Sequence, residues 1–326
     1  MSRRIATDPR QFVRLFGELA PQPVEVAFEA TFGWGWFADL LAEAGIPAHL
    51  AHPLRTKAIS AARVKNDAVD AKTLADLLRG GLLPEAWIAP PEVRETRRLV
   101  RMRAGLGRIR SRLKCQIHAL LGEQGILPQR TDLLGAGGRR QLADLALPPI
   151  SQARLEANLR LIDQISAEMK RAEQDLHALL GDDPRVHRLL PIPGIGFITA
   201  ATVVAEIWDV SRFPSPAHLA SWVGLTPSES SSAEHIRRGS ISKQGSRWLR
   251  WVLVEAACRA DRDPTLRAFL VRIARRRGIK IARVALAHRL LTLCFHALRN
   301  ETGCRAYPLP ASNGHGALVR SHGLSR

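Results

Sequence analysis

Alternation of apolar and polar residues predicts strands and helices in turn near the N-terminus. Residues 24–28, Val-Glu-Val-Ala-Phe, alternate and favour a strand, and the stretch from Trp36 to Ala44 suits a helix that ends at Gly45. Residues 46–50, Ile-Pro-Ala-His-Leu, are a second apolar strand candidate, and an amphipathic helix follows over about residues 67–79. Strands that alternate with helices indicate an α/β domain with paired parallel strands.

Apolar residues at steps of three and four predict two long helices after Pro90-Pro91. The first helix carries a run that is typical of a coiled-coil seam: Leu99, Met102, Leu106, Ile109, Leu113, Ile117 and Leu120. A Gly- and Pro-rich loop over residues 125–150 leads to a second run: Leu155, Leu159, Ile162, Met169, Leu176 and Leu179. The two helices could fold back as an antiparallel hairpin, or they could pair with another subunit.

The pattern changes again from Leu190 onward. A Pro-Gly turn and a helical stretch come first, and a Ser- and Gly-rich loop over residues 226–246 follows. Two apolar helices, over about residues 247–260 and 265–298, complete a mainly α C-terminal domain. The tail from about Tyr307 is rich in Gly, Ser and Pro, so we expect it to be disordered.

Charge points to a polyanionic partner. The chain has 326 residues and a formal net charge of +18, which attracts nucleic acid. Its length suggests two domains. We expect no membrane partner, because no apolar run approaches the roughly 20 residues of a spanning helix and no secretory segment follows Met1. Four separate cysteines indicate neither a zinc ribbon nor a disulfide framework, and suggest a reducing cytoplasm.

Three carboxylates are candidates for a metal site. Asp67 and Asp70 lie three residues apart at the start of a predicted helix, so both project from one face and could hold Mg²⁺. Glu29 directly follows the first strand and could supply a third oxygen ligand at the strand end. Capping of the helix and favourable interaction with its dipole are the alternative roles for the two aspartates.

The segment Pro193-Gly194-Ile195-Gly196 predicts a turn between two helices. Glycines let backbone N–H groups approach a phosphate, and the following helix N-terminus adds favourable charge. A helix-hairpin-helix that binds the DNA backbone through Gly194 and Gly196 fits this segment. A tight turn between packed helices is the alternative.

The serine-rich stretch has the groups needed for attack on phosphorus. Serines supply hydroxyls, and Arg237, Arg238, Lys243 and Arg247 supply cations that would stabilise charge on phosphate oxygens. A flexible loop is the alternative. Tyr307 is the single tyrosine and lies in the predicted tail, which argues against a tyrosine recombinase.

Further basic residues could contact nucleic acid. The first long helix carries arginines away from its apolar seam, and they suit either phosphate contacts or a solvated face: Arg94, Arg97, Arg101, Arg108 and Arg112. Arg275-Arg276-Arg277, with Lys280 and Arg283, could clamp nucleic acid. Trp248 and Trp251 could stack on bases, or could belong to the core.

The N-terminal motifs resemble those of a known family. Glu29-Ala30-Thr31-Phe32-Gly33 and Lys65-Asn66-Asp67-Ala68-Val69-Asp70-Ala71 are similar to segments of the DEDD insertion-sequence transposases of the IS-one-ten group, which act with a structured guide RNA. The resemblance covers about residues 3–300. It implies an RNase H-like, Holliday-resolvase-like domain over residues 1–90, in which Glu29, Asp67 and Asp70 are Mg²⁺ ligands.

The C-terminal motifs resemble the transposase domain of the same family. The similar segments are Leu190-Pro191-x-x-Gly194-Ile195-Gly196, Val223-Gly224-Leu225-Thr226-Pro227 and Ile241-Ser242-Lys243-Gln244-Gly245. The family's nucleophilic serine lies in a Ser-Ser-Gly segment, where this chain has Ser231-Ser232-Ala233. The resemblance therefore implies Ser232 as nucleophile, with Ser231 second. It implies a transposase domain over residues 183–300, which lies between the coiled-coil hairpin predicted by the apolar spacing, residues 91–182, and the tail predicted by composition, residues 301–326.

One carboxylate of the family's set has no counterpart. The first Asp of the DEDD set lies on an initial strand before the matched segment, and Asp8 lies in the segment that normally follows the first hairpin. The resemblance therefore predicts an N-terminally truncated chain, with an incomplete RNase H-like domain, an exposed sheet edge and one missing ligand.

The implied activity is cleavage and exchange of DNA strands of an insertion sequence, guided by an RNA. The implied setting is the bacterial cytoplasm, in association with the nucleoid, and the implied assembly is a dimer or tetramer with a composite site. A metal-dependent junction resolvase, with water as nucleophile, is one alternative. An inactive nucleic-acid-binding remnant is another.

Overall fold

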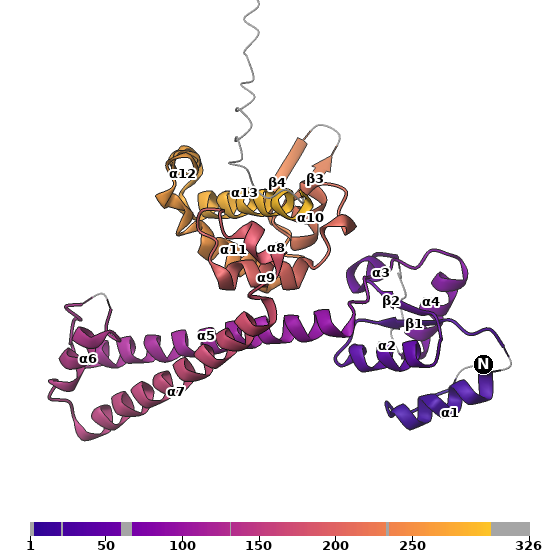
Figure 1. The fold of residues 1–326 in the computed structure, drawn as a ribbon, viewed down its shortest axis with the longest axis horizontal. Helices are drawn as coiled ribbons and strands as arrows, with labels where there is room; N and C mark the ends of the chain where they lie inside the picture. Colours follow the sequence, from indigo (N-terminus) through magenta and orange to yellow (C-terminus); the bar gives the residue numbers. More distant parts are fainter. Residues whose placement is uncertain (1–2, 21, 60–66, 131, 233–234, 301–326) are drawn as a thin grey trace, which may run out of the picture. The chain divides into compact units, whose positions relative to one another are not determined.

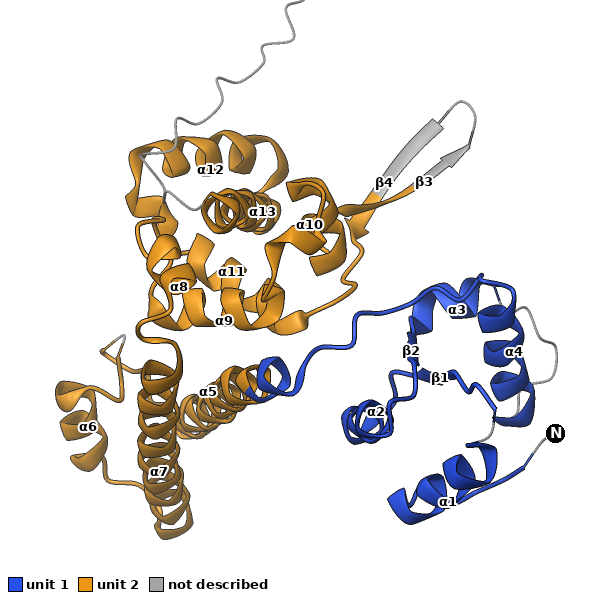
Figure 2. Ribbon diagram, turned by 45° about the vertical axis from the view of Figure 1, so that its right-hand side comes forward, with its two compact units in different colours: residues 1–95 blue, residues 96–326 orange. Residues whose placement is uncertain are grey.

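The computed structural model describes residues 3–20, 22–59, 67–130, 132–232 and 235–300, without the side chains of residues 230–238. The chain forms two compact units, Met1–Glu95 and Thr96–Arg326, coloured blue and orange in Figure 2. The predicted tail, residues 301–326, lies outside the described residues. Most of the described chain is helical, and the order of the elements is shown in Figure 1.

The first unit contains a parallel strand pair, as predicted. β1 (Val26–Glu29) pairs in register with β2 (Ala48–Ala51), and α2 (Trp34–Glu43) connects them. α3 (Pro53–Ile59) follows β2, and α4 (Asp67–Arg79) packs on β1. The α/β prediction is confirmed for these elements, whereas the described residues form a sheet of two strands only.

Aromatic side chains hold α1 (Pro9–Leu19) in the first unit. The ring of Phe12 lies 4.6 Å from that of Phe37, which in turn lies 5.2 Å from Phe28 of β1. Asp8 is the N-cap of α1, and its carboxylate accepts a hydrogen bond from the Arg10 N–H. Asp8 therefore has a structural role at the start of this helix.

Two long helices of the second unit run antiparallel within one chain. α5 (Pro91–Glu123) and α7 (Pro149–Leu180) are bridged by ion pairs between Arg103 and Glu173 and between Arg154 and Glu123. The residue numbers rise on one helix as they fall on the other, which is the pattern of an antiparallel hairpin. α6 (Ala136–Ala143) lies in the connection and contributes to the same apolar cluster.

The predicted seam of α5 is correct only near the end of the helix. Leu113, Ile117 and Leu120 pack with Leu155 and Ile162 of α7 in a buried cluster. Nearer the start of α5 the prediction is wrong, because Met102 and Ile109 are exposed, whereas Val100 and Ala104 are buried. Val100 belongs to the core of the C-terminal helices, so α5 has different partners at its two ends and its buried face shifts along its length.

The C-terminal core is built around α13 (Ile279–Arg299). It contacts α8 (Pro184–Leu189), α10 (Pro216–Val223), α11 (Arg247–Ala257) and α12 (Pro264–Arg277). The predicted helix over residues 265–298 is in fact two helices, because Gly278 has a φ of 82° and ends α12. By length and composition α13 could cross a membrane, contrary to the sequence expectation, but its apolar residues supply the centre of this core.

Arginines surround the C-terminus of α9 (Phe197–Ile207). Arg97 donates to the carbonyls of Ala205 and Glu206, and Arg212, in the short helix η1 (Val210–Arg212), donates to that of Ile207. Arg101 donates two hydrogen bonds, of 2.7 and 2.9 Å, to the Glu206 carboxylate. Burial lowers the pKa of Arg97, and it lowers that of Arg212 to about 10. The cations satisfy carbonyls at the negative end of the helix dipole.

Replacement of Arg101 tests this contact. Glu206 is 1% exposed, so Arg101→Ala leaves a buried carboxylate short of its main partner and should lower the free energy of unfolding by about 3 kcal/mol. Urea denaturation measures the effect. Arg112→Ala, an exposed arginine on the same helix, should change stability by less than about 0.5 kcal/mol. Equal effects of the two variants would contradict the structural role of the Arg101–Glu206 pair.

Candidate active site and nucleic-acid interface

The predicted metal ligands lie on two adjoining elements of the first unit. Glu29 is the last residue of β1 and is exposed. Asp67 and Asp70 occupy the first turn of α4, which packs on β1. Among the described residues none of the three carboxylates has an ion-pair or hydrogen-bond partner on its side chain, so their oxygens are available to a ligand.

The three carboxylates do not form a closed metal site. Within the described ranges, no group of three His, Cys, Asp or Glu side chains is arranged to hold one ion. The oxygen donors suit Mg²⁺ by their chemistry, whereas their arrangement is not that of a formed three-ligand site. His49 of β2 hydrogen-bonds Glu85 at 2.9 Å and lies 3.7 Å from Glu25.

The serine-rich stretch forms a β-hairpin, so the prediction of a flexible loop over residues 226–246 is wrong for its strands. β3 (Pro227–Ser232) pairs antiparallel with β4 (His235–Ile241). In this register Ser231 is opposite Ile236 and Ser232 is opposite His235, next to the tip. Arg237 and Arg238 lie on β4. Strand pairing therefore places the backbone of the predicted nucleophile and of two predicted cations on one narrow ribbon.

Two glycines lock the base of this hairpin to α10. At Gly224, with φ of 77°, a Cβ would lie 2.3 Å from the Gln244 carbonyl oxygen. At Gly245, with φ of 66°, a Cβ would lie 2.0 Å from the Trp222 carbonyl oxygen. Two backbone segments therefore cross in direct contact, which only glycine permits. Lys243, between them, also has a positive φ of 57° and donates its N–H to the Gly224 carbonyl.

Arg250 of α11 completes this junction. Its guanidinium donates to the carbonyls of Val223, at 2.7 Å, and of Gln244. Burial lowers the pKa of Arg250. One side chain therefore ties the end of α10, the base of the hairpin and the start of α11 together. Neither Arg250 nor the glycine pair is apparent from composition, although both glycines lie in the segments 223–227 and 241–245 that carry the family resemblance.

The two glycines of the Pro-Gly turn have different roles. Gly194, with φ of 84°, packs so closely that a Cβ would lie 2.5 Å from the Ala256 carbonyl oxygen, so this residue serves the tight packing of the turn. Gly196 is the N-cap of α9, and the space where its Cβ would lie is open. The structure therefore leaves Gly196 accessible for the predicted phosphate contact and gives Gly194 a packing role.

The predicted basic contacts on α5 and at the start of α11 are also divided. Arg97 and Arg101 are engaged at the end of α9, as described above. Arg108 and Arg247 both lie over the ring of Trp248, at 5.7 and 4.7 Å from its centroid. Trp248 is half-buried and Trp251 is 39% exposed, so neither is a fully buried core residue. Arg94, by contrast, is buried and binds Asp39 and the Gly35 carbonyl, which is inconsistent with a phosphate contact.

Sequence comparison identifies the family to which these features belong. The sequence model described as "Transposase IS116/IS110/IS902 family" matches residues 186–271, and a second, the DEDD transposase of the IS110 type, matches residues 1–125. A relative named "Putative transposase y4pF/y4sB" from Sinorhizobium fredii is 30% identical over 91% of this chain and 78% of its own length. The chain belongs to the IS116/IS110/IS902 transposase family.

Other relatives of this transposase carry similar names. A "Probable family 20 transposase" from Pseudomonas aeruginosa is 29% identical over 90% of this chain and 89% of its own length. The "Transposase for insertion sequence element IS1111A" from Coxiella burnetii is 27% identical over 85% and 78%, respectively. The family resemblance and the enzyme class inferred from the sequence motifs are thus confirmed.

A basic patch covers the end of α12 and the start of α13. All its cations are exposed, and among the described residues none has a carboxylate partner: Arg275, Arg276, Arg277, Lys280 and Arg283. These five cations could pair with up to five phosphates of a DNA backbone. The transposase therefore offers an unneutralised cationic surface that requires no specific sequence of its partner.

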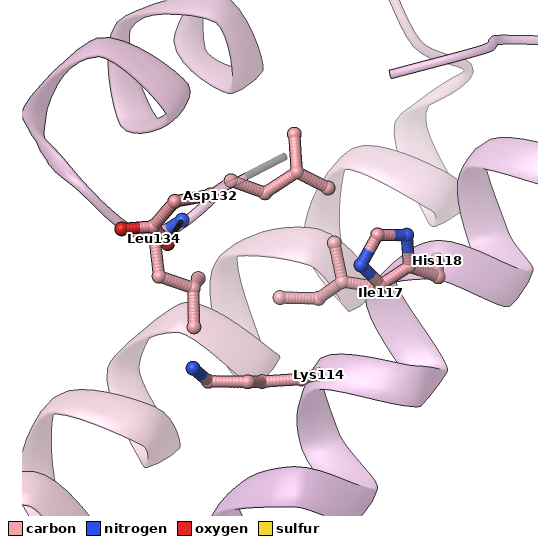
Figure 3. Close-up of a pocket in the computed structure, with 6 residues that line it drawn as sticks. Lys114, Ile117, His118, Asp132 and Leu134 are labelled. Carbon is pink, nitrogen blue, oxygen red and sulfur yellow. Dashed lines mark hydrogen bonds between the residues drawn. The ribbon is translucent and has the colours of Figure 1, made fainter. Parts of the chain in front are cut away.

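A small pocket at the far end of the helical hairpin has a different character. Lys114, Ile117 and His118 of α5 face Asp132 and Leu134 across an opening of about 60 Å³ (Figure 3). This volume is much smaller than a nucleotide. The pocket therefore does not qualify as a substrate site of the transposase.

A substitution at Gly245 tests the base of the hairpin. Gly245→Ala puts a Cβ against the Trp222 carbonyl and forces a positive φ on alanine, so it should cost at least about 2 kcal/mol of stability. Thermal or urea denaturation measures this loss. Gly105→Ala is the control, because Gly105 lies within α5 with open space at its Cβ position. It should be neutral or stabilising by about 0.5–1 kcal/mol. A neutral Gly245→Ala would refute the locked junction.

Removal of charge tests the basic patch. Joint replacement of Arg275, Arg276 and Arg277 by Ala should make log K for double-stranded DNA less steep against log salt, by about 0.9 for each lost phosphate contact. Binding titrations at several salt concentrations measure the slope. The control replaces Arg160 and Arg171, which pair with glutamates on α7, and should leave the slope unchanged. An unaltered slope in the triple variant would rule out contact between this patch and phosphates.

Proposed function

We propose that this transposase cleaves and rejoins the DNA strands of an insertion sequence through a serine nucleophile on the β-hairpin. Ser232 is the proposed nucleophile and Ser231 the second choice. The observation that carries the proposal is the β-hairpin itself: Gly224, Gly245 and Arg250 fix its base, and Ser232 is the last residue of β3. A nucleophile must be held in place to attack a phosphodiester efficiently.

The proposed step exchanges one phosphate ester for another. The Ser232 hydroxyl oxygen bonds to phosphorus and loses its proton, while the bond from phosphorus to one strand's oxygen breaks and that oxygen gains a proton. The product is a covalent phosphoserine–DNA link. Attack of a different DNA end on this link releases the serine and joins the new pair of strands. Lys243 and Arg247, beside the base of the hairpin, with Arg237 and Arg238 on β4, supply positive charge for the phosphate oxygens.

We further propose that Glu29, Asp67 and Asp70 hold Mg²⁺. Support comes from their oxygen donors, their position on β1 and α4, and the absence of competing cations among the described residues. Bound Mg²⁺ would supply positive charge that polarises a phosphodiester. These residues hold no formed three-ligand site on their own, so the proposal includes completion of the site by DNA.

Guide RNA and assembly are further parts of the proposal. A structured RNA fits the unneutralised basic patch of α12 and α13, because recognition of structured RNA relies largely on phosphates and shape. The carboxylates and the serine hairpin belong to different compact units of the chain. We propose that two or four copies assemble so that carboxylates of one chain serve the serine of another. DNA is the proposed substrate, because the family is one of transposases, which act on DNA.

The nucleophile is tested by trapping the covalent product. Incubation with end-labelled insertion-sequence DNA, Mg²⁺ and copurified RNA, followed by denaturing electrophoresis, should show a protein–DNA adduct. Ser232→Ala should abolish the adduct and lower strand exchange by about 10³-fold or more, whereas the neighbouring variant Ser230→Ala should retain both. Strand cleavage by Ser232→Ala without any adduct would instead indicate water as nucleophile, as in a junction resolvase.

The metal proposal is tested by calorimetric titration of Mn²⁺, a stand-in for Mg²⁺, into the protein with bound DNA. Asp67→Asn and Asp70→Asn should each weaken binding by about ten-fold or more, because each removes a charged ligand. Asp76→Asn is the matched control, because Asp76 lies on the same helix and pairs with Arg79 at 3.0 Å. Equal binding by Asp67→Asn, Asp70→Asn and Asp76→Asn would refute the assignment of these ligands.

A further inference from the structure

A cleft of the second unit lies between α5, α9 and α11 and has no role in the reaction proposed above. Its volume is about 360 Å³, and Trp248 and Trp251 of α11 line it together with the N-terminus of α9. Arg103, Arg110 and Arg259 supply its cations. A volume of this order accommodates one nucleotide and is too small for a double helix.

The two tryptophans of the cleft differ in what covers them. Arg108 and Arg247 lie over the ring of Trp248. Trp251 is 39% exposed, and no ring or cation contact to it is found among the described residues. A large aromatic ring exposed in a concave site is a stacking surface for a planar group, and bases stack on such rings whatever their sequence.

The charges of the cleft favour an anion. Arg103 is neutralised by Glu173 at 2.5 Å. Arg110 and Arg259, by contrast, have no carboxylate partner among the described residues, and Glu255 is the single acidic residue of the lining. Gly196, the N-cap of α9, has no side chain to cap the helix, and the first turn of α9 lines the cleft, so no side chain caps the first N–H groups there. An aromatic platform beside free cations and uncapped amides matches the two parts of a nucleotide, a base and a phosphate.

We propose that this cleft binds one unpaired nucleotide of a single-stranded or bulged nucleic acid, with its base on Trp251 and its phosphate between Arg110, Arg259 and the N-terminus of α9. The proposal rests on the proposed function only in assuming a nucleic-acid substrate. It adds a site that recognises unpaired structure, separate from the serine hairpin. Such a site would distinguish a melted or looped strand from a continuous duplex, which the basic patch of α12 and α13 cannot do.

The test compares two duplexes that differ by one extrahelical nucleotide. Fluorescence anisotropy with the full chain measures the ratio of affinities for the bulged and the perfect duplex, in separate DNA and RNA arms that reveal which source is preferred. The wild-type ratio should be about ten, Trp251→Ala should lower it to about one, and Trp251→Phe should restore most of it. Arg277→Ala, in the basic patch, should weaken both duplexes equally.

A second variant tests the cleft while Trp251 stays in place, so that any effect of the tryptophan on folding does not enter the result. Gly107 lines the cleft on α5, and a Cβ there would meet only Met169 Cε, at 3.8 Å. Gly107→Leu should fill the cleft without weakening the helix and should also remove the preference for the bulge. An unchanged ratio in folded Gly107→Leu and Trp251→Ala would overturn the proposal. Repetition in Ser232→Ala protein separates this outcome from failure of the serine chemistry.

Discussion

The buried carboxylate of Glu206 is the contact on which the second unit depends. It lies at the C-terminus of α9, where carbonyls and the helix dipole already concentrate negative charge. From α5, Arg101 binds this carboxylate and Arg97 donates to the backbone carbonyl of Glu206, while Arg212 donates to the carbonyl of Ile207 from the following turn. Because a buried charge is costly without partners, these arginines fix α5 against the C-terminal core, and α5 in turn sets the position of the helical hairpin.

A second constraint fixes the β-hairpin of β3 and β4. At the base of the β-hairpin two chain segments cross with carbonyl oxygens where a side chain would begin, at Gly224 and Gly245. Arg250 then binds carbonyls from both segments. The hairpin is thus fixed at its base, which suits a strand with the proposed nucleophile, and Arg250 ties the same junction to α11, whose two tryptophans line the cleft.

Local sequence patterns predicted the elements whose structure is determined by residues close by in the sequence. The parallel pair of β1 and β2, the helix that begins at Asp67 and the two long helices follow from alternation and from spacing of three and four. The pattern failed where a distant partner decides burial. Met102 and Ile109 fit a periodic seam, but Val100 packs into the C-terminal core, so the buried face of α5 changes along the helix. Serine-rich composition likewise concealed β3 and β4, and the glycine junction at their base depends on contacts with the end of α10.

The sequence by itself determined the family, through motifs around Glu29, Asp67, Gly194 and Ser232, and it determined the basic character that suits nucleic acid. Tertiary structure decided which of the basic residues are free. Arg94, Arg97 and Arg101 resemble Arg110 and Arg259 in sequence, yet the first three meet buried carboxylates or carbonyls and the last two face an open cleft. Spacing along a helix determines on which face an arginine lies. The groups that pack against that face determine whether the guanidinium binds a carboxylate or carbonyl of the same chain, or remains free to bind a partner.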